Sequence, residues 1–273
     1  MESRWDLIKR IINESDLVLE VLDARLVELS RNEEIERLIS EIGRPVIFAV
    51  NKSDLVSKKS LKNQINQLRG KGEVVFISAK KPKDVKILLY AIKRVFNKYG
   101  KREVIERQVG EPKLKYREAK GNIIVGVLGY PNVGKSSIIN ALAHKKKVRV
   151  NKKAGTTHGI HWVKILNEIK LIDSPGVIPL AKEDDIRYGL IGAKTEIANS
   201  EIVAYSVIEL FLKENKKKFE DFYGVKIDNS NVDEIFKKIG QKRNYLLKGG
   251  IIDENRTSSM IVRDWQQGRL RLK

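Results

Sequence analysis

A glycine-rich turn between a predicted strand and a predicted helix constrains the fold of this chain more than any other feature. Residues Gly129 to Ser136, GYPNVGKS, fit the pattern G-x-x-x-x-G-K-[ST]. They follow the apolar run IIVGVL at 123–128 and precede a helix expected to begin near Lys135. The two glycines let the backbone curl until its N–H groups point inward, where the helix N-terminus adds partial positive charge. The segment therefore predicts a phosphate-binding loop in an α/β sheet.

Two later segments fit the surroundings of bound phosphates. Lys135 is expected to reach the β- and γ-phosphate oxygens, and the Ser136 hydroxyl can ligate Mg²⁺. The sequence Asp173-Ser-Pro-Gly176 follows a predicted strand at 169–172, so that Asp173 can hold Mg²⁺ through water and the Gly176 amide can contact the γ-phosphate. Between these motifs lies AGTTHG, in which Thr157 is the preferred residue to complete the Mg²⁺ shell and Thr156 is the alternative.

A second group of polar residues precedes the phosphate loop in the chain. The apolar run PVIFAV ends at Asn51-Lys52-Ser53-Asp54. The Asp54 carboxylate can accept hydrogen bonds from guanine N1–H and the 2-amino group, a donor pair that adenine lacks. Asn51 can bind the opposite base edge and tie loops together, and the Lys52 stem can pack over the base. The next predicted strand ends at Ser78-Ala79-Lys80, where the Ala79 amide can contact the guanine carbonyl.

The pattern along the chain predicts a mostly parallel sheet followed by helices. Short apolar runs at 17–22, 45–50 and 74–77 alternate with helical patterns at 32–42, 58–69 and 84–98. Residues 161–166 and 169–172 are predicted to form a hairpin, and residues 100–120 a charged connector. From about 183 the pattern is helical only, with an apolar stripe that includes Val203, Val207 and Phe211. We therefore expect an α/β domain over 1–180 and a small all-α domain over 181–273.

All five motifs of a GTPase are present, but the guanine-binding ones come before the phosphate loop. In this order the chain resembles the circularly permuted GTPases that assist assembly of the large ribosomal subunit. The segment 21–32, VLDARLVELSRN, is similar to that family's opening segment, and Lys248-Gly249-Gly250 with 264–268, DWQQG, is similar to its C-terminal module. The resemblance implies a P-loop GTPase sheet, circularly permuted, that binds GTP or GDP with Mg²⁺ and hydrolyses GTP slowly. It also implies rRNA and the large subunit as partners.

The resemblance extends to single residues. The catalytic contribution is expected from Lys135, Thr157 and Gly176. Val177 stands where many small GTPases carry a glutamine that orients the attacking water, and His158 is the histidine best placed to replace it, although a structural or solvent-facing role is the alternative. In related GTPases an asparagine at the position of Asn132 helps to bind K⁺; the alternative is a loop residue that tolerates the backbone geometry. The expected nucleotide contacts are Asn51, Lys52, Asp54, Ser78, Ala79, Lys80, Asn132, Val133, Gly134, Lys135, Ser136, Ser137, Asp173 and Gly176.

The charge of the chain bears on its partners. A formal net charge of +19 favours contact with a polyanion: RNA or DNA is the first candidate and an anionic membrane the second, and a charge-rich surface typical of thermophiles is the alternative. Two basic runs are candidate phosphate contacts, 145–149 (KKKVR) and 269–273 (RLRLK), although either one can be a solvated face. With no cysteine, no secretory leader and no membrane-length apolar run, we expect a monomeric cytoplasmic protein that does not bind membranes. Two alternatives stay open: a GTPase acting on tRNA or other RNA processing, and a nucleotide-gated RNA-binding protein with negligible turnover.

Overall fold

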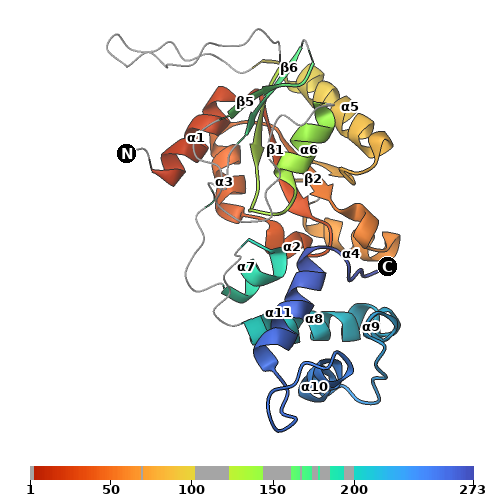
Figure 1. Ribbon diagram of the computed structural model, residues 1–273. Coiled ribbons are helices and arrows are strands. Elements are labelled where there is room, and N and C mark those ends of the chain that lie inside the picture. Colours follow the sequence, from red (N-terminus) through yellow and green to blue (C-terminus); the bar gives the residue numbers. More distant parts are fainter. Residues whose placement is uncertain are drawn as a thin grey trace.

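A six-stranded sheet forms the centre of the structure (Figure 1). The computed structural model describes residues 3–68, 70–101, 123–143, 161–166, 168–173, 178, 185–193 and 200–273. The strands are β1 (Leu17–Asp23), β2 (Val46–Asn51), β3 (Glu73–Phe76), β4 (Ile123–Leu128), β5 (His161–Lys164) and β6 (Ile169–Asp173). Their order is β3-β2-β1-β4-β6-β5, in which β5 pairs antiparallel with β6 and the other four pairings are parallel. The predicted α/β sheet and hairpin are therefore confirmed.

Helices cover both faces of the sheet, which explains why its strands are continuous apolar runs. On one side α1 (Arg4–Glu14) contacts α3 (Glu33–Ile42), and on the other α5 (Pro82–Tyr99) contacts α6 (Lys135–Leu142) (Figure 1). All seven residues of β1, in the middle of the sheet, are buried. Short elements complete this part: α2 (Val27–Ser30), η1 (Ser53–Leu55), α4 (Lys58–Gln64) and η2 (Ile65–Leu68).

The helix α1 is the element that the sequence pattern did not predict. Its N-cap Ser3 accepts a hydrogen bond from the Asp6 backbone amide, and the Asp6 carboxylate accepts one from the Ser3 amide. This reciprocal pair is a capping box. The buried residues Ile8, Ile11 and Ile12 follow at helical spacing. Both signals were present in the sequence, so this helix was predictable in principle.

The C-terminal region is helical, as predicted, and shares a hydrophobic core with the sheet. Its helices are α7 (Asp185–Ile191), α8 (Ser200–Glu214), α9 (Lys216–Tyr223), α10 (Val232–Lys242) and α11 (Glu254–Gln266). One cluster of buried side chains joins Phe211 and Trp265 of these helices to Leu22, Phe48 and Val50 of the central strands. The predicted division of the chain at residue 180 stays a prediction, because it falls outside the described residues.

The middle strand β1 buries two carboxyl groups, those of Glu20 and Asp23, and Glu20 is the one with an oxygen atom that lacks a partner. Glu20 in β1 is 1% exposed. Its Oε1 atom accepts a hydrogen bond from the Asn32 amide at 3.2 Å, whereas its Oε2 atom has no hydrogen-bond partner. Burial, together with the nearby charge of Glu36, raises the pKa of Glu20 to about 8 against the opposing effects of the Asn32 hydrogen bond and the charges of Arg31 and Lys71. This carboxyl group is therefore protonated at neutral pH.

Replacement of Glu20 by glutamine should flatten the dependence of stability on pH. Between the ordinary carboxyl pKa of 4.5 and about 8, the unfolded chain releases a proton that the folded protein retains. The wild-type free energy of unfolding should therefore fall as pH rises through this window, by at most about 1.4 kcal/mol per pH unit, and level off above it. Urea unfolding between about pH 5 and pH 9 measures this slope. The exposed Glu41→Gln variant should keep the wild-type slope; an unchanged slope in Glu20→Gln would contradict the assignment.

Candidate nucleotide-binding site

The predicted nucleotide motifs meet at one edge of the sheet. The guanine-binding residues follow β2, the phosphate loop follows β4, and Asp173 ends β6. Parallel strands present their carboxyl ends at the same edge. Cα pairing places Asp23 of β1 opposite Asn51 of β2, and Val127 of β4 opposite Asp173 of β6. Motifs that come in a permuted order along the chain therefore lie side by side in space.

Asn51 joins the two halves of this site. Its Nδ2 atom donates to the Val133 carbonyl of the phosphate loop at 2.9 Å, and its Oδ1 atom accepts from the Ala79 amide at 3.2 Å. A Cβ atom on Gly134 would lie 2.1 Å from Asn51 Nδ2, so this position needs a glycine. The expectation that Asn51 ties loops together is confirmed. The base contacts predicted for Asn51 and Ala79 stay predictions.

The remaining residues of the guanine-binding group lie where the motifs place them. Asp54 lies in the 3-10 turn η1 and is partly exposed, next to Lys52. Ser78 is buried and its amide donates to Asp84 Oδ2 at 2.8 Å, which holds the turn before α5. Lys80 follows Ala79 on the partly exposed side of the same turn. The carboxylate of Asp54 is thus accessible to a base, as its predicted role requires.

The phosphate loop is curled as its glycines predict. Gly129 has φ +143° and Gly134 φ +108°, and a side chain on Gly129 would approach the Val21 carbonyl to 2.6 Å. Lys135 Nζ donates to the carbonyls of Gly129 and Tyr130 at 2.6 and 2.8 Å. Burial lowers the pKa of Lys135 to about 8, although the charge of Asp173 acts in the opposite direction. The ammonium group therefore lies beside the first two residues of the phosphate loop.

The donor atoms near the loop fit a Mg²⁺ ion. Ser136 and Ser137 occupy the first turn of α6, directly after the loop. The buried Asp173 is the last residue of β6, which pairs with β4. Mg²⁺ prefers oxygen ligands and is commonly held by one or two protein oxygens together with substrate phosphates. Ser136 and Asp173 supply such oxygens. The other predicted contributors, Thr157, His158 and Gly176, lie outside the described residues.

The first C-terminal helix packs directly on the phosphate loop, a contact that the sequence did not predict. The Asn132 side-chain amide donates to the Gly192 carbonyl, just after α7, and Asn132 has φ 62°. The rings of Tyr130 and Tyr188 are 5.7 Å apart, and the Arg187 guanidinium lies 5.5 Å from the Tyr130 ring centre. A K⁺ contact at Asn132 would use its other amide atom, Oδ1, and stays a prediction.

A second contact links the guanine-binding group to α11. Lys52 Nζ donates to Asp23 Oδ2 at 2.7 Å, and Arg25 makes a bidentate pair with the same carboxylate at 2.7 and 2.9 Å. Arg25 also donates to the Trp265 carbonyl and lies 4.2 Å from the Trp265 ring centre. Burial alone would raise the pKa of Asp23, but the charges of Arg25 and Lys52 outweigh it and hold that pKa below its usual range.

The structure describes only one of the two basic runs, the tail at 269–273. Residues 145–149 lie outside the described residues. In the tail, Leu270 and Leu272 are buried whereas Arg269, Arg271 and Lys273 are exposed, so that the alternating pattern turns its cations outward. Arg269 is 3.4 Å from the Asp264 carboxylate. The tail therefore stays a candidate phosphate contact.

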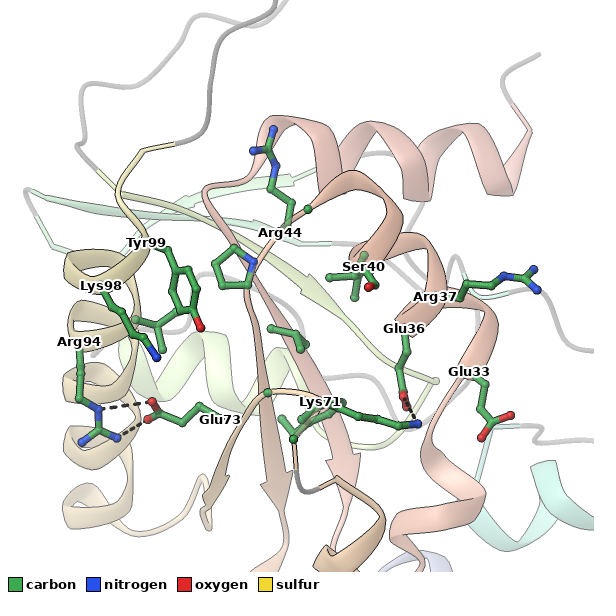
Figure 2. A pocket seen from close by; sticks show the side chains of 18 of the residues that line it. Glu33, Glu36, Arg37, Ser40, Arg44, Lys71, Glu73, Arg94, Lys98 and Tyr99 are labelled. Atoms are coloured by element: carbon green, nitrogen blue, oxygen red, sulfur yellow. Dashed lines mark hydrogen bonds and ion pairs between the residues drawn. The ribbon is translucent and has the colours of Figure 1, made fainter.

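A large groove lies at the opposite end of the sheet and contains none of the predicted site residues. Its volume is about 1420 Å³, and it is lined by α3, α5 and the loop before β3. Figure 2 shows Glu73 paired with Arg94, and Lys71 paired with Glu36 at 3.2 Å. The groove is lined by both acidic and basic side chains: Glu33, Glu34, Glu36 and Glu73, and Arg37, Arg44, Lys71, Arg94 and Lys98. Because these charges largely cancel, the groove lacks the positive field that a triphosphate needs.

None of the helices in the described part of the chain is both long and apolar enough to cross a membrane.

Comparisons with known proteins agree with the nucleotide-binding motifs. The family model described as "50S ribosome-binding GTPase" matches residues 124–245. An uncharacterized GTP-binding protein of Methanocaldococcus jannaschii is 38% identical over 97% of this chain, and ribosome biogenesis GTPase A of Bacillus cereus is 30% identical over 93%. The chain spans 65% of the length of the first protein and 84% of the second.

Solved structures support the fold. A GDP-bound structure of YlqF superposes with a TM-score of 0.62 at 21% identity, covering 97% of this chain and 95% of that one. A GNP-bound YlqF from T. maritima gives a TM-score of 0.56 at 20% identity, covering 97% and 94%. At this level of identity the likeness establishes the architecture, including the helical C-terminal region.

Proposed function

Because the chain belongs to the family of circularly permuted GTPases that includes the ribosome biogenesis GTPase A proteins, we propose that it acts as a nucleotide-switched factor in large ribosomal subunit assembly. In this role it binds GTP, hydrolyses it to GDP and phosphate, and contacts rRNA. The observation that carries the nucleotide part is Asn51, which joins the guanine-binding loop to the phosphate loop. That connection, together with the strand order, brings the proposed guanine reader and phosphate cradle into one site.

The chemistry assigned to the described residues is positioning and charge stabilisation. Lys135 and the loop N–H groups bind the β- and γ-phosphates and stabilise the charge that develops on them during transfer. Asp54 selects guanine, and the Lys52 stem packs against its face. Mg²⁺, when bound at Ser136 and Asp173, would neutralise further phosphate charge. Thr157 and Gly176 are assigned to the metal and the γ-phosphate, and His158 to the water, on the sequence motifs alone.

The partner of this nucleotide-switched protein is proposed from the names of its relatives and from its net charge. Proteins similar to this chain include GTPase grn1 of Schizosaccharomyces pombe and nucleolar GTP-binding protein 2 of Yarrowia lipolytica, as well as the ribosome biogenesis GTPase A proteins. The net charge of +19 suits a polyanionic surface such as rRNA. The names of the ribosome biogenesis relatives favour a ribosomal partner over tRNA, whereas the net charge suits either RNA. We further propose that the free protein is a cytoplasmic monomer.

Turnover measurements with and without purified large subunits test the proposal. We expect slow intrinsic GTP hydrolysis that is raised by large subunits, and higher turnover in K⁺ than in Na⁺ if Asn132 holds a K⁺ ion. Equal turnover in all these conditions would count against stimulation by large subunits and against stimulation by K⁺. Negligible turnover with tight GTP binding would instead support a nucleotide-gated RNA-binding protein. Co-sedimentation with tRNA but not with subunits would support the RNA-processing alternative.

The conformational part of the proposal concerns the helices after Asp173. In the permuted order the γ-phosphate motif leads directly toward α7 and α8, so GTP should reorient the C-terminal helices relative to the sheet. Hydrogen exchange over 200–273 with a GTP analogue and with GDP measures this. Identical exchange in the two states would exclude a γ-phosphate switch of these helices.

A further inference from the structure

We propose that Asp23 and Arg25 are positioning residues for the guanine base: they fix Lys52 beside the base and, through Trp265, couple base binding to helix α11. The proposal rests on the proposed function only in requiring that the site binds guanine nucleotides. It adds a second connection between nucleotide and C-terminal helices, distinct from the γ-phosphate. The segment Asp23-Ala24-Arg25 otherwise has no role in the site.

The first step is that Asp23 is fixed in place. It is 1% exposed and ends β1 directly beside Asn51. Its Oδ1 atom accepts from the Arg25 amide at 3.0 Å and from Arg25 Nε at 2.9 Å, and its Oδ2 atom accepts from Arg25 and from Lys52 at 2.7 Å each. Four donors to two oxygens leave the carboxylate one orientation. The carboxylate is therefore a rigid anchor for whatever it holds.

The second step is that the Lys52 side chain is held at both ends, by its own backbone at one end and by the Asp23 carboxylate at the other. The Lys52 backbone is left-handed, with φ 62°, between Asn51 and the turn that carries Asp54. Its ammonium group is tied to Asp23, and its side chain is 20% exposed. The methylene stem is therefore held along the floor of the turn, where a base bound to Asp54 would pack against it. Without Asp23 the ammonium can turn into solvent, and the stem loses this position.

The third step connects the same anchor to α11. The Arg25 side chain is 1% exposed, donates to the Trp265 carbonyl and stacks on the Trp265 ring. Trp265 in turn donates from Nε1 to the Leu190 carbonyl at 2.7 Å. A second bond runs in parallel, from the Leu272 amide to the carbonyl of Leu55 at 3.0 Å, in the turn that carries Asp54. A base that orders this turn therefore orders the contacts of α11 as well.

This connection and the one at the phosphate loop start from different loops and meet where α11 bonds to α7, through Trp265 to Leu190 and Gln266 to Gly189. The phosphate loop contacts α7 through Asn132 and Tyr130, whereas the guanine-binding turn contacts α11 and the segment after it. Base and phosphates thus make their first contacts with different helices, although the two helices are joined to each other. Since coupling between two sites is reciprocal, loosening the attachment of α11 should weaken base binding more than phosphate binding.

Binding measurements on Asp23→Asn test the positioning role. The variant keeps the size of the side chain but loses its charge, and Lys52 and Arg25 are then partnered only by a neutral amide. We expect affinities for guanosine and for GDP to fall by about tenfold or more, and tripolyphosphate affinity to stay at the wild-type value. GTP turnover should show a raised KM at unchanged kcat. Asp228→Asn, which breaks the exposed pair with Lys238, is the matched control and should change neither affinity.

Arg25→Lys provides a second variant with the charge retained. Lysine cannot make the bidentate pair with Asp23 and reach Trp265 as well. We expect a loss of guanosine affinity in the same direction, again without a change for tripolyphosphate. Equal losses for guanosine and tripolyphosphate in either variant would indicate general damage to the site and overturn the positioning role.

Hydrogen exchange on the wild-type protein tests the coupling without any substitution. Saturating guanosine should slow exchange in 254–266 more than tripolyphosphate does, and adenosine serves as the control. Guanosine binding without slower exchange in α11 would overturn the coupling while leaving the proposed function intact. A protein that binds neither guanosine nor GDP would refute the proposed function itself.

Discussion

Replacement of Asp54 by asparagine should change the base preference of this protein from guanine to xanthine. The carboxylate is expected to accept two hydrogen bonds from guanine, from N1–H and the 2-amino group. An amide can accept the first but meets the second with its own N–H₂ donor. Each hydrogen bond to a charged group is worth about 1.5–3 kcal/mol, so GTP affinity should fall at least about a hundredfold. Xanthine carries an acceptor in place of the amino group and matches the amide.

The loop geometry makes this substitution a clean test. The turn is held by the backbone bonds from Leu55 to Lys52 at 2.9 Å and from Ser53 to Ile77 at 3.1 Å, neither of which uses the Asp54 side chain. Titration of the variant with GDP, xanthosine diphosphate and ADP measures the preference. Wild-type affinity for ADP equal to that for GDP, or a variant that still prefers GDP, would refute the base assignment.

Replacement of Lys135 by methionine should abolish GTP turnover and preserve the fold. The methionine side chain fills the space of the lysine stem but cannot reach the phosphates with a charge. Loss of a preorganised cation at the transferred phosphate costs about a thousandfold or more in rate. Methionine removes an ammonium that is held at a cost in solvation, but it also removes the donor to the Gly129 and Tyr130 carbonyls, so the free energy of unfolding should fall by at most about 1–3 kcal/mol.

The two substitutions should separate base from phosphate recognition. Lys135→Met is expected to retain guanosine affinity, because guanosine has no phosphate, and to lose affinity for tripolyphosphate. Asp54→Asn should do the reverse. A Lys135→Met protein that hydrolyses GTP at the wild-type rate would show that the phosphate loop is not the catalytic cradle. Far-ultraviolet circular dichroism checks that both variants are folded.

The parts of this structure that the sequence predicts are those with local signals. The glycines at 129 and 134 and the alternation of apolar runs indicated strand, loop and helix, and the sheet confirms them. Asn51 was predictable as a tie between loops because the motif fixes its neighbours in space. Glu20 was predictable as buried, since it lies inside an apolar run; burial is the main cause of its raised pKa, whereas the added effect of Glu36 comes from a separate helix that no local signal marks.

The parts that could not be predicted depend on where distant segments meet. The pair Arg25 and Trp265 is separated by 240 residues, and Asn132 and Gly192 by 60. Nothing local to either partner marks the contact, because a buried arginine or a loop asparagine has many alternative partners. Thr157, His158 and Gly176 lie outside the described residues, and their roles stay predictions.

The distance between Arg25 and Trp265 along the chain has a consequence for biosynthesis. Translation at about 5–20 residues per second needs tens of seconds to add 240 residues. During that interval the newly made strands β1 and β2 have left the ribosome, while Phe211 and Trp265, which cover Leu22 and Phe48 in the finished protein, do not yet exist. The newly made guanine-binding part of the chain therefore exposes the apolar side chains of Leu22 and Phe48 until the C-terminal helices cover them, and we expect it to bind a holding chaperone in that interval. A competent nucleotide site is completed late in synthesis, when α11 emerges.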